Sequence, residues 1–430
     1  MSVVVSEPPP LPRRAISPVV RFAPGLIALV VFWLAPLPGT VDAHRAIAIS
    51  VATIIWWATG PLQPAATGLV ALVLFAVTGI SDLPTIVSGF WNDTTGFLLG
   101  ALTIGLFVSR TGLAQRLAFS LAAKLGRSYS GLLLALVTVD FVLTFLIPSG
   151  IARVAVLAAI VAGLVEATGL PRRDPAARGL MIAVTCSASL FDKMVLAGTS
   201  SILASGIIER IGGVRISYGL WFLAYVPCVL LTILGSWRIV LWLFPDVTRT
   251  FDASDRYFRE SLVALGPPTR QERMATILSA AAIALWLTDV WHDLPPATVA
   301  LSIGALAFMP GIRLLRPADL LRLPYPTLVF TATALSISAV LSDTGALRLL
   351  TGSMVEWMRV VIHGPASASL VLYLGGVRVS PAARRAESDG HRDAAAGRHL
   401  RAVDRSQPAG RRAHLAVRDR GQDFRTRAAC

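Results

Sequence analysis

Apolar stretches separated by short polar segments recur along most of the chain and set its predicted architecture. They lie at about residues 24–38, 44–60, 64–79, 95–109, 131–147, 151–167, 179–190, 194–208, 219–244, 274–290, 296–309, 324–341 and 360–376. A helix needs about 20 apolar residues to cross the hydrocarbon core of a bilayer, so several of these stretches are short enough to be half-crossings. The pattern predicts an all-α polytopic membrane protein.

The composition supports the same architecture. Hydrophobic residues make up 54% and charged residues 15% of the 430 positions, and the mean hydropathy is +0.66. Such a chain is too apolar for a soluble globular domain. The net charge of +14 comes mostly from basic residues in loops beside apolar stretches, where they set membrane orientation. We therefore expect the lipid bilayer, and not nucleic acid, as the surrounding partner.

Motifs that mark pumps and enzymes are absent from the sequence. It contains no GxxxxGK[ST] phosphate loop, and its apolar stretches carry no HExxH, GxSxG or paired-aspartate signature. Cys186, Cys228 and Cys430 show no spacing typical of a disulfide framework or a metal site. The sequence thus predicts neither an enzyme nor a bound cofactor.

The placement of charge divides the chain into segments. Basic residues in segment 1–23 place the amino terminus in the cytoplasm, before the first transmembrane helix. Residues 24–245 form a first apolar unit, 246–273 a polar cytoplasmic linker, and 274–379 a shorter second unit. The last segment, 380–430, is rich in arginine. We expect a multi-pass protein of a bacterial inner membrane.

The sequence FLIPSGIARVAV, residues 145–156, interrupts the apolar region 131–167 with a proline, a serine and a glycine. Basic residues flank both ends of this region, so both ends are expected in the cytoplasm. Two halves of about 17 residues joined by a polar tip favour a re-entrant hairpin, because each half is short for a crossing. Two full crossings with a tight outer turn are the alternative, since charge counting gives the same result for both.

The residue types at this tip suit ion binding. Pro148 removes a backbone donor and Gly150 relaxes the backbone, which together end one half-helix. Ser149 can cap the next half-helix, whose amide groups then point their partial positive charge at the break. That arrangement binds an anion, and the carbonyl groups that end the first half suit Na⁺. The tip either binds a cation and a carboxylate side by side or is an ordinary turn.

A second interruption, LAGTSSILASG at residues 196–206, lies in a broken helix expected over about 179–208. Gly198, Thr199 and Ser200 offer backbone freedom and hydroxyl oxygens inside an apolar stretch. If they face the first tip, they complete the oxygen shell of the cation. The alternative is a face of small residues that packs against another helix.

Ionisable residues inside apolar stretches are costly and suggest either function or pairing. Asp140 lies in the first half of the hairpin and Arg153 in the second. Arg153 either attracts the anionic substrate or forms a structural bridge with Asp140. Asp140 is also a candidate for proton coupling. Asp192 and Lys193, between two helical pieces, are expected to pair with each other.

The chain also repeats itself. FLLGALTIGLFVSRTG, residues 97–112, aligns without gaps with FTATALSISAVLSDTG, residues 330–345, and Arg110 falls opposite Asp343. Counting crossings places the two copies in opposite directions across the membrane. Inverted repeats with broken helices are a recurring design of secondary transporters. Chance similarity between helices rich in small residues is the alternative.

The composition changes abruptly after Ser380. The last 50 residues hold twelve arginines, six acidic residues and half of the histidines. One reading is a disordered basic tail that binds lipid headgroups. The other is a frameshift near Val379–Ser380, because codon degeneracy permits a DNA sequence that encodes GQDFR in one frame and GKIFV after a one-base shift, with apolar strings before it. That reading predicts that the recorded chain transports little or nothing.

Several of these strings resemble one family. PSGIARVAVLAAI resembles the Pro-Ser-x-x-Ala-Arg tip of the divalent anion/Na⁺ symporter family, which includes bacterial di- and tricarboxylate carriers. LAGTSS is similar to that family's Gly-Thr-Pro-Pro-Asn break, and the shifted-frame string GGKIFV to its final helix. The resemblance implies two inverted repeats, a scaffold that forms a homodimer, and a transport domain that moves as an elevator. It extends over about residues 24–379, which leaves the second repeat incomplete.

The resemblance also implies site residues. Na⁺ would be held by Ser149, Gly150, Gly198 and Thr199. The substrate would be bound by Ser149, Gly150, Ile151, Thr199 and Ser200. The chain departs from the family at Gly150 and Ile151, where many members have Asn and Thr side chains that touch the substrate carboxylate, so only backbone amides are available there.

The function predicted from these observations is secondary transport of small divalent anions, such as di- or tricarboxylates, coupled to Na⁺ or driven by exchange. A proton-coupled anion permease and a non-functional truncated product are the alternatives. Transport driven by a pH gradient without any effect of Na⁺ would favour the proton-coupled permease.

Overall fold

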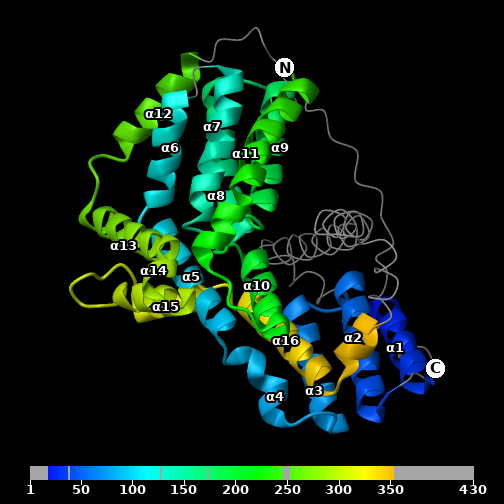
Figure 1. The fold of residues 1–430 in the computed structure, drawn as a ribbon. Helices are drawn as coiled ribbons and strands as arrows, with labels where there is room; N and C mark the ends of the chain where they lie inside the picture. Colours follow the sequence, from blue (N-terminus) through cyan, green and yellow to red (C-terminus); the bar gives the residue numbers. More distant parts are fainter. Residues whose placement is uncertain (1–17, 37–38, 126–127, 172–173, 246–251, 353–430) are drawn as a thin grey trace, which may run out of the picture. The chain divides into compact units, whose positions relative to one another are not determined.

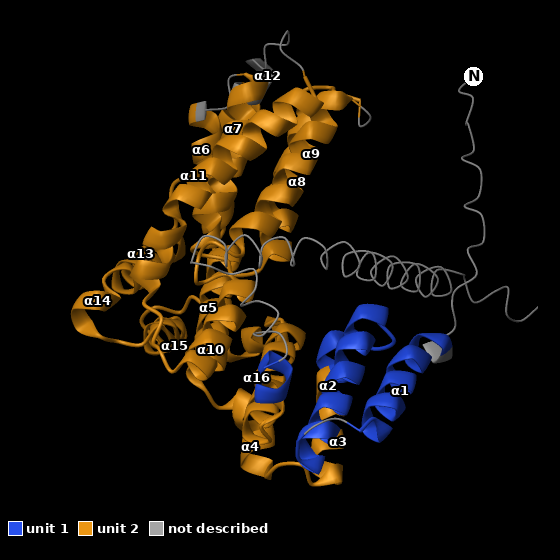
Figure 2. Cartoon of the chain, turned by 45° about the vertical axis from the view of Figure 1, so that its right-hand side comes forward, with its two compact units in different colours: residues 1–67, 348–430 blue, residues 68–347 orange. Residues whose placement is uncertain are grey.

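The structure, a computed structural model, describes residues 18–36, 39–125, 128–171, 174–245 and 252–352. All regular elements within these residues are helices, as the apolar pattern predicts. The chain divides into two compact units, one formed by residues 1–67 and 348–430 and the other by residues 68–347 (Figure 2). The predicted frameshift and the apolar stretch at 360–376 concern residues outside those that the structure describes.

The first unit contains α1 (Pro18–Leu34) and α2 (Val41–Thr59), and α3 (Pro64–Thr78) begins in it. The hydroxyl of Thr40 caps α2 by accepting a hydrogen bond from the Ala43 amide at 3.2 Å. Phe22 of α1 and Trp56 of α2 hold the two helices together. Their rings meet edge to face at 6.0 Å, and the Trp56 indole N–H donates to the Phe22 carbonyl at 3.1 Å.

The second unit carries the remaining helices, which Figure 1 shows in chain order. Its first half consists of α4 (Leu83–Val87), η1 (Ser88–Phe90), α5 (Asp93–Arg110), α6 (Leu113–Leu125), α7 (Tyr129–Thr144), α8 (Gly150–Ala167), α9 (Pro175–Phe191), α10 (Thr199–Gly212) and α11 (Tyr218–Leu243). Its second half consists of α12 (Asp252–Ala264), α13 (Arg270–Leu287), α14 (Asp289–His292), α15 (Pro296–Leu306), η2 (Pro317–Arg322) and α16 (Tyr325–Asp343).

Within the described residues, three helices are long and apolar enough to cross a bilayer: α8, α11 and α16. A fourth span results if the pair Leu83–Arg110 and Leu113–Lys124, bent by 67°, crosses as one. The other apolar helices are 10–17 residues long, namely Val20–Leu34, Pro64–Thr78, Tyr129–Thr144, Pro175–Phe191 and Pro296–Leu306. The expectation that several apolar stretches are short for a crossing is confirmed.

Helices α5 and α15 approach each other through small residues. A Cβ atom added at Gly100 of α5 would lie 2.5 Å from the backbone of Ala300 in α15. One added at Gly304 of α15 would lie 3.3 Å from the side chain of Thr103. Small residues on both helices therefore permit the close packing that apolar helices use in membranes.

The pair α3 and α16 makes a related contact. A Cβ atom added at Gly68 of α3 would overlap the side chain of Thr333 in α16. Gly68 and Ala300 are each the fifth residue of their helix. Thr333 and Gly100 occupy equivalent positions in the aligned segments 330–345 and 97–112. In each contact the fifth residue of one helix meets the fourth residue of one of the two aligned segments, and the glycine lies on α3 in the first case and on α5 in the second.

Helices α5 and α16 also end in the same way. Thr111 follows α5 and Thr344 follows α16, and each hydroxyl donates to the carbonyl four residues earlier at 2.8 Å. Gly112 and Gly345 come next, with φ of +83° and +75°. Glycine adopts this left-handed backbone without steric cost, so the Thr-Gly pair stops both helices.

Candidate functional site

The first predicted tip is a true break between two helices. Helix α7 ends at Thr144 and α8 begins at Gly150. Ser149 is the N-cap of α8, and its hydroxyl accepts a hydrogen bond from the Ala152 amide at 3.3 Å. The predicted cap is confirmed. The first amide groups of α8 have no acceptor inside the helix, and the Ile151 side chain beside them is 79% exposed.

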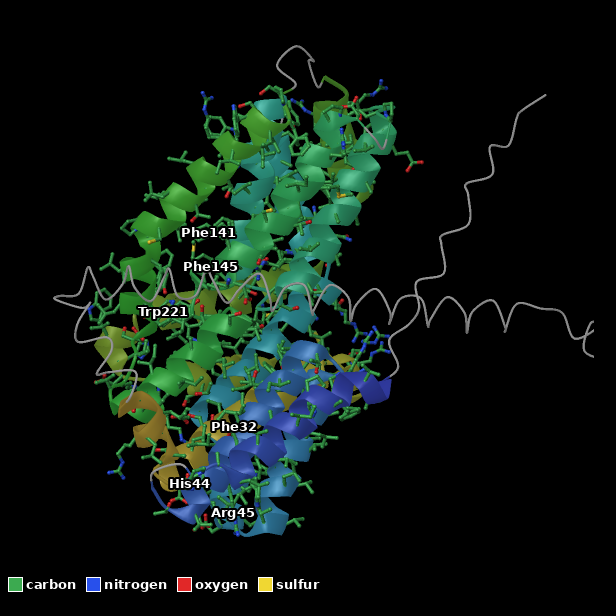
Figure 3. All side chains as sticks on the ribbon, turned by 90° about the vertical axis from the view of Figure 1, so that its right-hand side faces the viewer. Phe32, His44, Arg45, Phe141, Phe145 and Trp221 are labelled. Atoms are coloured by element: carbon green, nitrogen blue, oxygen red, sulfur yellow. The ribbon has the colours of Figure 1, made fainter. Side chains whose placement is uncertain are left out.

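Aromatic side chains fix the last turn of α7 that leads to the tip. The ring of Phe141 lies 5.3 Å from that of Phe145 and 5.4 Å from that of Phe191 on α9. Phe145 in turn lies 5.4 Å from Phe222 on α11. All three pairs have the edge-to-face geometry that aromatic rings favour. Figure 3 labels Phe141 and Phe145.

The second predicted break is also present, because α9 ends at Phe191 and α10 begins at Thr199. Asp192, directly after α9, folds its carboxylate over the start of α10. Oδ1 accepts from the Thr199 amide at 3.1 Å, and Oδ2 accepts from the Ser200 amide at 3.2 Å and the Ser200 hydroxyl at 2.6 Å. The Asp192 carbonyl accepts from the Ser201 hydroxyl at 3.1 Å. Four hydrogen bonds therefore close the break into a compact loop.

This loop requires glycine at position 198. Gly198 is buried, and a Cβ atom added there would lie 2.0 Å from the carbonyl oxygen and 2.7 Å from the carbonyl carbon of Asp192. No real Cβ atom makes so close a contact with backbone. Gly198 has φ of −69° and ψ of 143°, which any residue can adopt, so glycine is needed here for the close backbone approach of residue 192 and not for conformational freedom.

The two breaks touch each other. The Thr199 amide donates to the Pro148 carbonyl at 3.3 Å, and the Thr199 hydroxyl donates to the same oxygen at 3.1 Å. A Cβ atom at Gly150 would lie 3.3 Å from the Ala188 carbonyl of α9, so the start of α8 also packs closely on the helix that precedes the second break. The structure thus places Thr199 of the second break against Pro148, the residue before Ser149 of the first.

Arg153 and Asp140 form a fully buried ion pair, both with 0% exposure. The Arg153 Nε lies 3.0 Å from the Asp140 Oδ1. The guanidinium also donates to the Ile147 carbonyl at 2.9 Å and to the Ala188 carbonyl at 2.8 Å. Of the two roles open to Arg153, the geometry is that of a structural bridge, which ties the first tip to α7 and α9.

The expected pairing of Asp192 with Lys193 is wrong. Asp192 bonds to Thr199, Ser200 and Ser201 instead, while the Lys193 side chain is exposed. An aspartate seven residues before a helix carries no capping signature, because N-caps are recognised directly before the first turn. Sequence reasoning therefore missed the role of Asp192.

A separate cavity of about 500 Å³ lies in the second unit. Its walls come from the start of α5, from α10 and the loop after it, and from the start of α15. Leu196, on the second break, is one of its lining residues, but none of the six predicted substrate and Na⁺ residues lines it. The described residues contain no cluster of three His, Cys, Asp or Glu side chains suited to a metal ion. Where the two breaks meet, the Thr199 hydroxyl lies 3.1 Å from the Pro148 carbonyl oxygen.

Comparison with known proteins gives one family. The family described as sodium:sulfate symporter transmembrane region matches residues 18–378. A membrane protein of Cupriavidus necator is 25% identical over 358 residues, which cover 78% of this chain and 70% of that protein. An L-tartrate/succinate antiporter of Shigella dysenteriae is 26% identical over 336 residues, covering 75% of this chain and 66% of the antiporter.

A Bacillus subtilis protein named as a malate transporter, YflS, is 26% identical over 294 residues. The match covers 66% of this chain and 61% of that protein. The chain thus spans between 61% and 70% of the length of these three relatives. The names of the family and of two of the relatives describe transporters and not enzymes.

Proposed function

Because the chain belongs to the family of the sodium:sulfate symporter transmembrane region, we propose that it is a secondary transporter of small dicarboxylates. Relatives named for malate and for tartrate and succinate support the choice of substrate class. Two broken helices that lie beside each other are the arrangement in which such a transporter binds its substrate. In this chain, the two hydrogen bonds from Thr199 to the Pro148 carbonyl hold the breaks together, and this is the main structural support for the proposal.

The substrate site in this proposal lies at the two breaks. One carboxylate of the substrate is bound by the first amides of α8, at Gly150 and Ile151, because a helix N-terminus attracts anions. The hydroxyls of Ser149, Thr199 and Ser200 complete its polar surroundings. Backbone amides replace the Asn and Thr side chains of related tips, so recognition depends on the helix terminus more than on side-chain shape.

The coupling ion is proposed to be Na⁺, held by oxygens at Ser149, Gly150, Gly198 and Thr199, unless the protein works by exchange alone. Proton coupling through Asp140 is the alternative. The Asp140 Oδ1 is bonded to Arg153, while its Oδ2 is buried without a hydrogen-bond partner among the described residues. A proton on Oδ2 would leave the buried Arg153 charge without its counter-charge, which is costly. This favours Na⁺ or exchange.

Two inverted repeats are part of the proposal. Supporting it, α5 and α16 end in the same Thr-Gly pair, and the α3–α16 and α15–α5 contacts each join the fifth residue of one helix to the fourth residue of an aligned segment. The polar contacts at the helix ends correspond as well. Arg110 at the end of α5 pairs with Asp319 of η2, the element before α16. Asp343 at the end of α16 accepts a hydrogen bond of 2.7 Å from the hydroxyl of Ser81, which lies just before α4.

Elevator movement, a homodimer, and a position in the inner membrane with a cytoplasmic amino terminus follow from membership of the family and complete the proposal. In an elevator, the tip and the second break move as one body. The Arg153 bridge and the Thr199–Pro148 bonds support this, because they tie α7, α8, α9 and α10 into one unit.

The test is uptake of radiolabelled succinate, L-malate and tartrate by vesicles that contain the purified chain. An inward Na⁺ gradient, an inward proton gradient and an internal load of unlabelled dicarboxylate are applied separately. Stimulation by Na⁺ or by the internal load supports the proposal, and stimulation by the proton gradient alone supports the alternative. No binding and no uptake of any dicarboxylate would contradict it.

A second candidate is a product that binds but does not transport. Its support is that the family match ends at residue 378, beside the frameshift predicted near Val379–Ser380. A chain with a single-base correction near codon 380 is assayed in the same vesicles. Uptake by the corrected chain only, with substrate binding in both, favours this candidate. Equal uptake by both chains excludes it.

A further inference from the structure

We propose that Asp192 is a specificity-determining residue, whose fixed negative charge at the second break limits the charge that a bound substrate can carry there. The inference rests on the proposed function, since it concerns the dicarboxylate site at the two breaks. It assigns a role to a side chain outside the predicted set of site residues.

The carboxylate of Asp192 lies directly beside the first tip. The Thr199 amide is shared between two acceptors, the Asp192 Oδ1 at 3.1 Å and the Pro148 carbonyl oxygen at 3.3 Å. Pro148 is separated by one residue from Gly150, where α8 begins. The Asp192 carboxylate at the start of α10 is therefore held against the first tip, and the inference places the second carboxylate of a substrate, whose first is bound at the start of α8, toward Asp192.

The two helix termini at the breaks differ in charge. The start of α10 is neutralised by an ionisable group, because Asp192 accepts from the Thr199 amide, the Ser200 amide and the Ser200 hydroxyl. The start of α8 has only the neutral hydroxyl of Ser149, which accepts from Ala152. An anionic substrate consequently meets one terminus that attracts it and one that already holds a negative charge.

The surrounding charges do not cancel this effect. Arg153 is bonded to Asp140, so this buried pair is neutral as a whole. Lys193 follows Asp192, but its side chain is exposed to solvent, which screens its charge. At an effective dielectric constant of about 20, two unit charges about 8 Å apart change a binding constant about 30-fold, and solvent at this half-exposed site reduces that to about tenfold.

The inference predicts different effects on two ligands that have the same shape and different charge. Succinate carries two carboxylates, and succinamate has the same skeleton with one of them replaced by an amide. Asp192 disfavours the second charge of succinate and leaves the amide of succinamate unaffected. Removal of the Asp192 charge should therefore raise the ratio of succinate to succinamate affinity about tenfold.

The experiment is calorimetric titration of the purified full chain with each ligand, at one pH and one salt concentration. Asp192→Asn removes the charge and keeps one side-chain oxygen that can accept from the Thr199 amide, and Asp192→Ser removes the charge with a smaller polar side chain. Glu209→Gln makes the same chemical change on α10, about 15 Å further along the helix at 1.5 Å per residue. Thermal unfolding in detergent is recorded for every variant, and the serine variant replaces the asparagine variant if the latter unfolds.

We expect the affinity ratio to rise in both Asp192 variants and to stay constant in Glu209→Gln. If both ligands gain or lose affinity equally on loss of the Asp192 charge, the residue is only a structural cap and the inference is overturned. Binding would in that case still uphold the proposed function. If neither ligand binds the unmodified chain, the proposed function itself fails.

Discussion

Thr199 is bonded to Pro148 twice, since its amide nitrogen lies 3.3 Å and its hydroxyl oxygen 3.1 Å from the same carbonyl oxygen. The two residues are 51 positions apart in sequence and belong to the two breaks. Proline cannot donate a hydrogen bond, but its carbonyl can accept two. One oxygen atom therefore holds the second break against the first.

Thr199→Val should weaken the contact with Pro148, because valine has the same side-chain shape as threonine but lacks the hydroxyl, while the backbone amide remains. Loss of one such hydrogen bond costs about 0.5–1.5 kcal/mol, so we expect dicarboxylate affinity to fall about two- to tenfold. Thr185→Val is the matched control, since the Thr185 hydroxyl only bonds back to Met181 on its own helix. Equal affinity of both variants for succinate would show that the contact does not shape the site.

Ser149→Ala should remove the cap of α8 and a candidate Na⁺ oxygen. A lost N-cap costs about 0.5–2 kcal/mol, which leaves expression near normal. If Na⁺ drives transport, we expect its half-saturating concentration to rise.

The control is Ser128→Ala, which removes the corresponding cap of α7, where the Ser128 hydroxyl accepts from the Gly131 amide at 3.1 Å. The Na⁺ response of that variant should not change. An unchanged Na⁺ response in Ser149→Ala itself would refute the assignment of this side chain.

Gly198→Ala and Gly198→Leu should abolish substrate binding while membrane insertion continues. The added Cβ would lie 2.0 Å from the Asp192 carbonyl oxygen, and backbone cannot yield as a flexible side chain would. The loop at the second break must therefore open. Gly235→Ala is the control, because nothing lies within 4 Å of a Cβ at that position. Normal uptake by Gly198→Leu would mean that the Gly-Thr-Ser-Ser segment is only a packing surface.

The positions of both breaks could be predicted from the sequence. Pro148 cannot continue the preceding helix, Gly150 weakens it, and Ser149 stands in the usual place of an N-cap. Gly198, inside an apolar stretch with three hydroxyl residues after it, likewise indicates a break. These are local signals, and the structure agrees with them.

The partners of the charged residues could be predicted only in part. Asp140 and Arg153 are 13 residues apart on the two helices that flank the first break, and the sequence alone leaves their pairing as one of two interpretations. Asp192 was assigned to its neighbour Lys193, because a chain reversal that returns the carboxylate to Thr199 leaves no local signature. The close approach of the Asp192 carbonyl to Gly198 results from this chain reversal. The pattern of apolar residues does not predict the reversal.

Arg153→Met should destabilise the protein strongly, because it leaves the Asp140 carboxylate buried without its partner. Breaking a buried ion pair from one side costs about 3–5 kcal/mol. We expect a large fall in the yield of folded protein after detergent extraction. The double variant Asp140→Leu with Arg153→Met should recover part of that loss, since no buried charge remains.

The exposed pair Arg256–Glu260 provides the comparison. Its Nε–Oε1 distance of 2.9 Å is close to that of the buried pair, but its side chains are 80% and 67% exposed. Arg256→Met should therefore leave the yield almost unchanged. If Arg153→Met folds as well as Arg256→Met, Arg153 is not a structural bridge, and its role as an attractor of substrate is restored.

The ion pair between Arg116 of α6 and Glu272 of α13 leads to a prediction of how the stability of the protein depends on pH. The Arg116 Nε donates to Oε1 at 2.9 Å and Nη2 donates to Oε2 at 3.2 Å. The Thr269 amide donates to Oε2 as well, at 2.7 Å. Glu272 precedes the apolar stretch expected at 274–290, and α13 is not among the described helices that are long and apolar enough to cross a bilayer.

These hydrogen bonds, that from Arg116 above all, hold the pKa of Glu272 below its usual value near 4.5, although burial opposes them. A carboxyl group with a lowered folded-state pKa contributes stability above its unfolded pKa and loses it as the pH falls through the folded value. The midpoint of thermal unfolding should therefore be constant near neutral pH and fall below about pH 4.5.

In Glu272→Gln the midpoint should be lower at neutral pH and should fall less steeply in acid. Glu260→Gln, at the exposed pair, should follow the unmodified chain. If Glu272→Gln shows the same acid profile as the unmodified chain, another carboxylate is responsible for the loss of stability.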